Sequence, residues 1–217
     1  MADRSERSHP NPEEEIMRAT YRALCEYGYA DLTMKRIAEE YGKSTAAIHY
    51  HYDTKDDLLV AFLEFILDHL KAAVHEVETT DPRTRLDHLL DQLLVVPEDH
   101  YDLLVAMLEM RGQAPYNETF RERFERNDEY VRYMLETVID QGREEGVFCD
   151  ADAEHVARGL ATIVDGARTR AVTFEDARVL ETARRTADEY VRAMLLRDEP
   201  GESDGLDEPD EPNDGES

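Results

Sequence analysis

Apolar residues recur every three or four positions along most of this chain, which is the spacing of one face of an α-helix. No segment alternates apolar and polar residues as a half-buried strand does. Asn11-Pro12 is typical of a helix start, and Gly28 is typical of a helix end. The pattern therefore predicts an all-α protein of about nine helices. The first predicted helix carries its apolar face on Ile16, Ala19, Thr20, Ala23, Leu24 and Tyr27.

The predicted helices fall into two groups along the chain. Three short helices are predicted within residues 11–58, and longer helices follow within residues 59–197, with a break at Pro97. No internal repeat of the length that solenoid proteins use is present. We therefore expect a small three-helix head on a larger helical body.

The two ends of the chain have the composition of unfolded segments. Residues 1–10 are polar, and we expect a flexible N-terminus there. Residues 198–217 contain ten acidic and no basic side chains, and Leu206 is their only large apolar residue. Such a segment cannot bury enough apolar surface to offset the entropy of ordering it. We expect residues 198–217 to be a disordered acidic tail.

Acidic residues also predominate outside the tail. Of the net charge of −26 of the whole chain, residues 61–197 alone contribute −12. Two interpretations remain open. The first is adaptation to a cytosol of molar salt, where the Debye length falls to about 3 Å and self-repulsion is screened. The second is an ordinary acidic protein. The scarcity of lysine after residue 43, where only Lys55 and Lys71 occur, favours the halophilic interpretation.

Several classes of protein are disfavoured by what the sequence lacks. Cys25 and Cys149 are too few for a disulfide framework and lack metal-ligand spacing. No window approaches the uncharged apolar length that a transmembrane helix needs, and no signal peptide is evident. The sequence shows no glycine-rich phosphate loop, zinc motif or nucleophile elbow. We therefore expect a soluble cytoplasmic protein that is not an enzyme and binds no metal, cofactor or membrane.

Residues 33–52 have the pattern of a helix-turn-helix. Two short helical segments are separated by Tyr41-Gly42-Lys43-Ser44, in which glycine permits a left-handed turn and serine caps the second helix. The side of this pair that is predicted to be buried carries Ile37, Ala38, Ile48 and Tyr52.

The opposite side of the second helix has the residues that DNA recognition needs. Thr45 and Ala46 are small enough for the start of the helix to enter the major groove. Side chains around them supply donors for phosphate oxygens, and the helix starts at Thr33 and Thr54 offer backbone amides. His51 fits a packing or capping role equally well. The candidate DNA-binding residues are Thr33, Lys43, Ser44, Thr45, Ala46, His49, Tyr50, His51 and Lys55.

The same stretch resembles the DNA-binding domain of the TetR family of transcriptional regulators. The resemblance rests on Ile37-Ala-Glu-Glu-Tyr-Gly-Lys-Ser and on Ala47-Ile-His-Tyr-His-Tyr-Asp-Thr-Lys-Asp-Asp-Leu-Leu, and it covers roughly a quarter of the chain. It implies that Tyr50 and Lys55 reach the DNA backbone and that Thr45 reaches base edges. The sequence departs from the family pattern at Tyr41, Lys43, Ala46 and His49, and His49 puts one phosphate contact in doubt.

The resemblance also implies an effector pocket enclosed by the helices of the body. Aromatic and methionine side chains suit such a pocket, although the protein core is a competing place for most of them. Few basic residues look buried, which argues against a strongly anionic effector. The candidate effector-binding residues are Tyr101, Met107, Met110, Tyr116, Phe120, Phe124, Tyr130 and Met134.

The last two predicted helices are implied to pair with their copies in a homodimer, as two recognition helices on one operator require. We therefore expect a ligand-responsive DNA-binding transcriptional repressor whose partners are a double-stranded DNA operator, a small-molecule effector and a second copy of the chain. The alternatives are a helical protein-interaction module and a small metal-binding enzyme, neither of which binds DNA. The small and branched residues expected to face the partner are Ala157, Leu160, Ala161, Val164, Ala187, Val191 and Met194.

Overall fold

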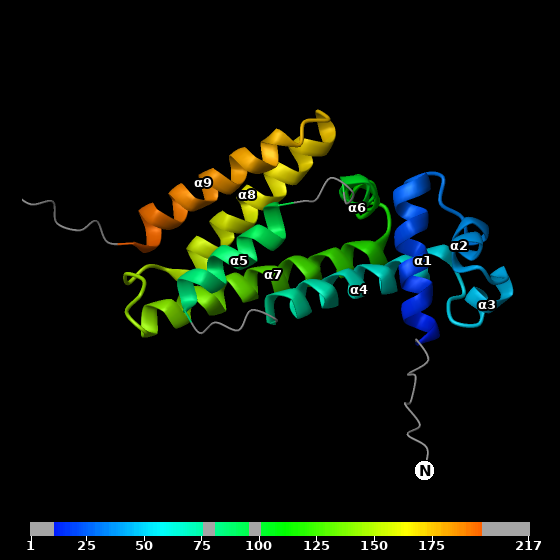
Figure 1. Cartoon of the computed structure of the whole chain (residues 1–217), viewed down its shortest axis with the longest axis horizontal. Helices are drawn as coiled ribbons and strands as arrows, with labels where there is room; N and C mark the ends of the chain where they lie inside the picture. Colours follow the sequence, from blue (N-terminus) through cyan, green and yellow to red (C-terminus); the bar gives the residue numbers. More distant parts are fainter. Residues whose placement is uncertain (1–10, 76–80, 96–100, 197–217) are drawn as a thin grey trace, which may run out of the picture.

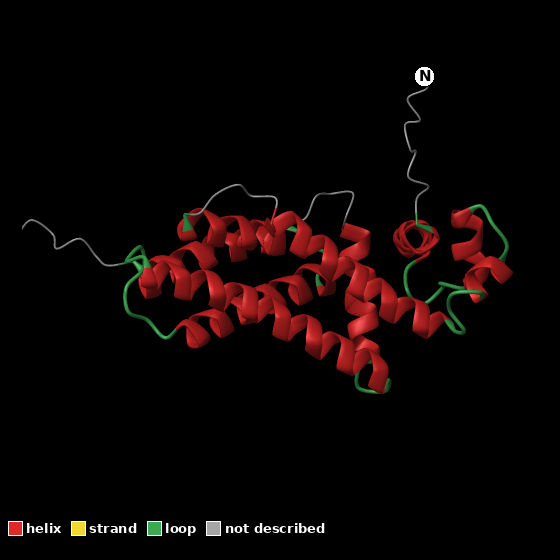
Figure 2. Ribbon diagram, turned by 90° about the horizontal axis from the view of Figure 1, so that it is seen from below, coloured by secondary structure: helices red, strands yellow, loops and turns green. Residues whose placement is uncertain are grey.

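The computed structural model of the chain describes residues 11–75, 81–95 and 101–196. These residues form nine α-helices and no strand, which confirms the all-α prediction (Figures 1 and 2). In the part of the chain that is described, no helix has the length and apolarity needed to cross a membrane. The expected flexible N-terminus, the break at Pro97 and the acidic tail lie outside the described residues. The helices are α1 (Pro12–Tyr27), α2 (Met34–Tyr41), α3 (Thr45–His49), α4 (Lys55–His75), α5 (Pro82–Leu94), α6 (Tyr101–Gln113), α7 (Glu118–Glu144), α8 (Ala153–Thr173) and α9 (Arg178–Leu195).

The first helices begin and end where local chemistry predicts. At the start of α1, Asn11 Oδ1 accepts a hydrogen bond from the backbone N–H of Glu13 at 3.2 Å. α4 begins with a reciprocal capping box, in which Thr54 N–H donates to Asp57 and Asp57 N–H donates to Thr54 Oγ1. These contacts satisfy amides that the first turn of a helix leaves without partners.

The head and the body follow one another along the long axis of the molecule, with the head at one end. Figure 1 shows α1, α2 and α3 at one end, while α4 and α7 run alongside each other from the head into the body. α8 and α9 pack together as the outer layer of the body, over α5 and α7. Because α4 is continuous from Lys55 to His75, it leaves the head without a break and enters the body.

Buried side chains form two clusters, and the cluster of the head reaches into the body. The head cluster holds the apolar faces of α1 to α3 and the first half of α4, together with Ala106 and Met110 of α6 and Phe120 and Phe124 of α7. The second cluster joins α5, the second half of α7, α8 and α9. The head is therefore anchored on α6 and α7 through apolar contacts as well as through the continuous α4.

One glycine marks a close approach inside the body. A Cβ atom placed on Gly142 of α7 would lie 2.1 Å from Cδ2 of Phe148, which is buried after the turn that follows α7. Because Gly142 has no side chain, the Phe148 ring packs directly against the backbone of α7.

The structure corrects the prediction of which side chains of the last two helices face a partner subunit. Ala157, Leu160, Val164 and Ala187 are each at most 3% exposed, because they face the core of their own subunit. The prediction that these side chains contact a partner is therefore wrong. Both faces of α8 carry small residues, so the spacing of small residues alone did not indicate which face turns inward.

Candidate DNA-binding surface and body cavities

The turn between α2 and α3 sets the direction of α3. Gly42 adopts φ +70°, in the left-handed region that glycine favours, and the backbone N–H of Lys43 donates to the carbonyl of Ala38 at 3.3 Å. The chain then reverses, and Ile48 of α3 is fully buried in the head cluster. Ser44 occupies the N-cap position of α3, but its side chain makes no capping hydrogen bond, so the cap expected from the sequence is not formed.

With Ile48 turned inward, the opposite side of α3 is presented to solvent. Ala46 and His49 are exposed, Thr45 is half-buried, and Tyr50 at the end of the helix is 86% exposed. A tyrosine this exposed buries little of its apolar ring against the rest of the protein. The structure therefore places Thr45, Ala46, His49 and Tyr50 on one outward surface.

The cations beside α3 are partly neutralised by α1. Lys43 Nζ lies 3.1 Å from Glu15 Oε2 and 2.9 Å from the hydroxyl of Tyr41. The pKa of Lys43 is raised, mainly by the hydrogen bond to Tyr41 and next by the hydrogen bond to Glu15. His51 Nδ1 lies 3.7 Å from Glu13 Oε1. The acidic first turn of α1 therefore faces the basic groups of the helix-turn-helix.

His51 and Lys55 are held by protein contacts. The His51 ring packs edge-on against Tyr50, with the ring centroids 5.2 Å apart. Lys55 is half-buried, because its Nζ donates to the carbonyl oxygen of Leu32 at 3.3 Å and lies 4.7 Å from the centroid of the Tyr29 ring. The contribution of either side chain to DNA binding stays a prediction.

The starts of α2 and α4 are capped by side chains of the protein. Thr33 is exposed, and its Oγ1 accepts a hydrogen bond from the backbone N–H of Arg36 at 3.2 Å. Asp57 N–H at the start of α4 is likewise taken by Thr54 Oγ1 at 3.1 Å. The backbone amides of Arg36 and Asp57 therefore already have partners. The expectation that the helix starts at Thr33 and Thr54 offer uncapped amides to phosphate is wrong for these two amides.

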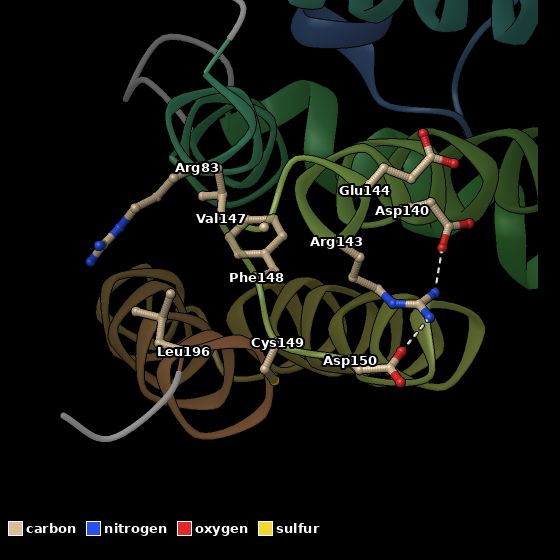
Figure 3. Close-up of a pocket in the computed structure, with 10 residues that line it drawn as sticks. Arg83, Asp140, Arg143, Glu144, Val147, Phe148, Cys149, Asp150 and Leu196 are labelled. Carbon is tan, nitrogen blue, oxygen red and sulfur yellow. Dashed lines mark hydrogen bonds and ion pairs between the residues drawn. The ribbon is translucent and has the colours of Figure 1, made fainter. Parts of the chain in front are cut away.

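A hollow lies at the end of the body away from the head. It measures about 880 Å³ and lies between the turn after α7 and the end of α9 (Figure 3). Arg143 reaches across this turn and donates to Asp140 and Asp150, each at 2.7 Å. The hydrogen bond to Asp150 raises the pKa of Arg143, and that to Asp140 adds to it. Figure 3 shows Arg83 extending away from this group. Arg143, which lines the hollow, is therefore already paired with two carboxylates.

Comparison with known proteins decides the identity of this fold. Residues 16–62 match the profile of bacterial regulatory proteins of the tetR family, and residues 82–196 match that of the C-terminal part of BetI-type transcriptional repressors. The second match alone spans more than half of the chain. The chain belongs to the TetR family of transcriptional regulators.

Individual relatives agree with this assignment. The chain is 30% identical over 167 residues to the HTH-type transcriptional repressor AcnR of Corynebacterium efficiens, and the match covers 75% of this chain and 83% of AcnR. Among solved structures, it resembles a TetR transcription regulator from Haloarcula marismortui, with 66% identity, a TM-score of 0.80 and coverage of 85% and 98%. A transcriptional regulator from Saccharomonospora viridis in complex with choline shares the fold, with 24% identity, a TM-score of 0.74 and the same coverage.

In this TetR-family chain, the candidate effector-binding side chains do not gather at one place. Four of them, Met110, Phe120, Phe124 and Met134, are buried in the two apolar clusters. Tyr116 is 89% exposed, and Tyr101 donates a 2.9 Å hydrogen bond to the carbonyl oxygen of Ala171. Tyr130 lies under Lys71, and Met107 lines a cavity of about 170 Å³ to which Phe124 also contributes.

That cavity is bordered by charged residues that the sequence reasoning missed. It shares Arg111, Asp165 and Arg168 with a neighbouring cavity of about 130 Å³, and the two lie between α5, α6, α7 and α8. Arg111 donates to both carboxylate oxygens of Asp128, at 2.6 and 2.9 Å. Burial raises the pKa of Asp165 and lowers that of Arg168. Asp165 is exposed as a whole residue, and it is also one of the residues that line both cavities.

A signal for this cluster was present in the sequence. Arg168 lies four residues after Val164, and Arg111 lies four after Met107, so both arginines continue an inward helical face. None of the basic residues in the described part of the chain is fully buried, so the expectation that few of them are buried holds. Two half-buried arginines, Arg111 and Arg168, nevertheless line the cavities of the body.

Proposed function

We propose that this protein is a homodimeric, cytoplasmic transcriptional repressor that leaves its DNA operator when a small molecule binds in the helical body. The observation that carries the proposal is the surface of α3, where Thr45, Ala46 and Tyr50 face outward while Ile48 anchors the helix in the head. Repression is supported by the name of the AcnR relative, and a small-molecule ligand by the choline complex of the Saccharomonospora regulator.

The outward surface supports an assignment of roles. The short α3 enters the major groove with Thr45 and Ala46 leading, because these residues are small enough to let the helix approach base edges. Tyr50 and Lys43 flank the helix and donate to phosphate oxygens. Contacts with phosphates position the head on DNA, whereas Thr45 contributes to the choice of sequence.

A second copy is needed to present two such heads, and the outer face of α8 and α9 is the surface we propose for it. Gly166 is exposed in the middle of α8, and a Cβ placed on it would meet nothing within 4 Å. An exposed glycine inside a helix costs about 1 kcal/mol relative to alanine, so a contact from outside the subunit is a reason for its presence. The exposed residues around it include Thr162, Thr169, Thr182 and Thr186.

Substitution of Gly166 tests this dimer surface. We expect Gly166→Leu to be monomeric in sedimentation experiments in molar potassium chloride, because the new side chain occupies the place of the partner helix. Gly112→Leu is the matched control, since Gly112 is also helical and has open space around it. A Gly166→Leu variant that remains as dimeric as Gly112→Leu excludes this face.

The effector acts by linkage in this proposal. A ligand that binds one arrangement of the two heads better than the other shifts the population toward that arrangement and lowers the affinity for the operator. The reverse also holds, because DNA must weaken effector binding by the same factor.

DNA binding itself is tested by titrating the protein against the DNA upstream of its own gene and measuring fluorescence anisotropy at several salt concentrations. We expect Tyr50→Ala with Lys43→Ala to weaken all sites alike, and Thr45→Ala to change the sequence preference. Tyr133→Ala is the control, because Tyr133 is an exposed tyrosine of α7 in the body. The absence of binding at every salt concentration, with and without cell metabolites, would refute the proposal.

We further propose that the protein works in concentrated salt. Its net charge of −26 and its 66% identity to the Haloarcula marismortui regulator support this. In molar salt the Debye length is about 3 Å, so the carboxylates repel one another less. The thermal midpoint is expected to rise as potassium chloride increases from millimolar to molar, and a midpoint that falls would contradict a halophilic origin.

A further inference from the structure

Arg168 of α8 has more hydrogen-bond donors than the protein uses. Its Nε donates to the carbonyl oxygen of Leu93, at the end of α5, at 3.0 Å. A guanidinium has five N–H donors, and no described residue accepts from the other two nitrogens of Arg168. Those nitrogens belong to a side chain that lines both body cavities.

Two other half-buried arginines of the body are paired with carboxylates. Arg111 makes a bidentate pair with Asp128, and Arg184 contacts Asp87, Asp91 and Asp188. Arg168 has no ion pair within the described part of the chain. Burial lowers the pKa of Arg168, which means that the fold disfavours its charged form.

A half-buried cation without an ionic partner is stabilised when an anion pairs with it. The Leu93 carbonyl compensates in part, because it belongs to the negative end of α5. It uses only one of the donors. Arg132 also lines the smaller cavity and adds positive charge there, whereas Arg158, which lines it too, is paired with Glu154.

The larger cavity offers an apolar wall next to Arg168. Leu104, Met107, Leu108 and Phe124 line its 170 Å³, together with Thr169. A cavity of about 150 Å³ accommodates a molecule the size of benzene. The space therefore suits a short acyl chain or a single aromatic ring, with a polar group at Arg168.

The charges around the site limit that polar group to one negative charge. Arg111 is already neutralised by Asp128, so Arg168 is the cation lining the larger cavity that remains to be paired. A second negative charge on the ligand would face Asp165 and Asp128, which border the same space.

Building on the proposed repressor function, we propose that the effector is a small organic monocarboxylate, with its carboxylate on the terminal nitrogens of Arg168 and its apolar part against α6 and Phe124. Guanidinium and carboxylate match in geometry, so the pair makes two parallel hydrogen bonds. Binding restores to Arg168 the partner that the isolated subunit lacks.

The site also contacts the helix that holds the head. α6 supplies Leu104, Met107, Leu108 and Arg111 to the cavities, and Glu109 of the same helix accepts a hydrogen bond from the backbone N–H of Tyr29 at 2.8 Å. A ligand that displaces α6 therefore acts directly on a contact of the DNA-binding head.

Thermal unfolding and calorimetry with benzoate and hexanoate test the proposal, with benzamide and hexanamide as neutral counterparts at constant potassium. The wild-type protein is expected to bind the two carboxylates and to gain thermal stability from them, whereas the amides bind at least about tenfold more weakly because they lack a charge-assisted hydrogen bond. Equal binding of acids and amides, or no binding of either carboxylate, overturns the proposal.

Arg168→Met tests the role of the arginine. We expect this variant to lose the response to carboxylates while remaining folded, with a thermal midpoint equal to or above that of the wild type, since it removes an unpaired cation. Arg126→Met is the control, because Arg126 is exposed on α7 and lies 3.9 Å from Glu122. A carboxylate response that survives Arg168→Met and equals that of Arg126→Met overturns the assignment.

Operator titrations separate this inference from the proposed function. If the carboxylates bind through Arg168 but no DNA is bound, the site stands and the repressor function fails. If the operator is bound and neither carboxylate binds or releases it, the repressor function stands and the monocarboxylate site is excluded.

Discussion

The backbone N–H of Tyr29 donates a 2.8 Å hydrogen bond to Oε2 of Glu109, which joins the end of α1 to α6. The same carboxylate oxygen would lie 3.4 Å from a Cβ placed on Gly28, so α6 meets the head at the turn that ends α1. Because Glu109 is on the helix that also supplies Arg111, one rigid element contacts both the head and the cavities of the body.

Replacement of Glu109 is expected to loosen this contact. In Glu109→Leu the amide of Tyr29 loses its acceptor and should exchange with deuterium faster than in the wild type, whereas Glu109→Gln retains an acceptor oxygen and most of the protection. Residue-resolved hydrogen exchange measures this. Unchanged protection of Tyr29 in Glu109→Leu would show that the hydrogen bond does not hold the head.

Removal of the Glu15 carboxylate is expected to strengthen DNA binding. In Glu15→Gln the Lys43 ammonium loses its 3.1 Å partner, so it pairs with a phosphate without first leaving a carboxylate. The affinity for DNA should rise a few-fold at low salt, and the gain should shrink as salt screens both interactions.

Glu14→Gln controls for the change in net charge. Glu14 pairs with Arg18 of the same helix at 2.7 Å and has no contact with Lys43. Anisotropy titrations over a salt series compare the two variants. An equal gain in both would mean that only the overall charge matters.

Gly142→Ala is expected to destabilise the body. The added methyl group would overlap the Phe148 ring, with 2.1 Å between Cβ and Cδ2, and overpacking of this kind costs about 1–3 kcal/mol. Thermal unfolding measures the loss, and Gly142→Ala with Phe148→Leu should recover part of it. Gly112→Ala, where a Cβ meets nothing, should be neutral or stabilising. A Gly142→Ala variant as stable as Gly112→Ala would contradict the close packing of Phe148.

The stability of the protein is expected to depend on pH through Asp165. Burial raises the pKa of Asp165 above its ordinary 3.8 and outweighs the attraction of Arg111. The folded protein therefore binds this proton more readily than the unfolded chain, so stability decreases as the pH rises through that range. Asp165→Asn removes this loss.

Chemical denaturation at several pH values checks the sign. Asp165→Asn should be more stable than the wild type at neutral pH, and the difference should shrink as the pH falls toward the ordinary carboxyl range. A variant that is less stable at neutral pH would show that the attraction to Arg111 and Arg168 dominates.

The helices and the recognition surface were accessible from the sequence. The left-handed turn at Gly42, the cap at Asn11 and the capping box of Thr54 and Asp57 each depend on residues at most a few positions apart, so their patterns are visible in one segment. The outward position of Tyr50 followed in the same way from the inward position of Ile48 two residues earlier.

The partners of the charged side chains were decided by the tertiary structure. Lys43 meets Glu15 from the preceding helix, Lys55 meets the carbonyl of Leu32, and Arg168 lies beside cavities built from four helices. The tertiary structure also decided which side of α8 turns inward. Both sides of this helix carry small residues, and only its packing on α7 and α9 buries Leu160 and Val164. Helix formation and capping are short-range interactions, which the sequence alone determined, whereas electrostatic pairing and burial depend on which distant segments meet in the fold.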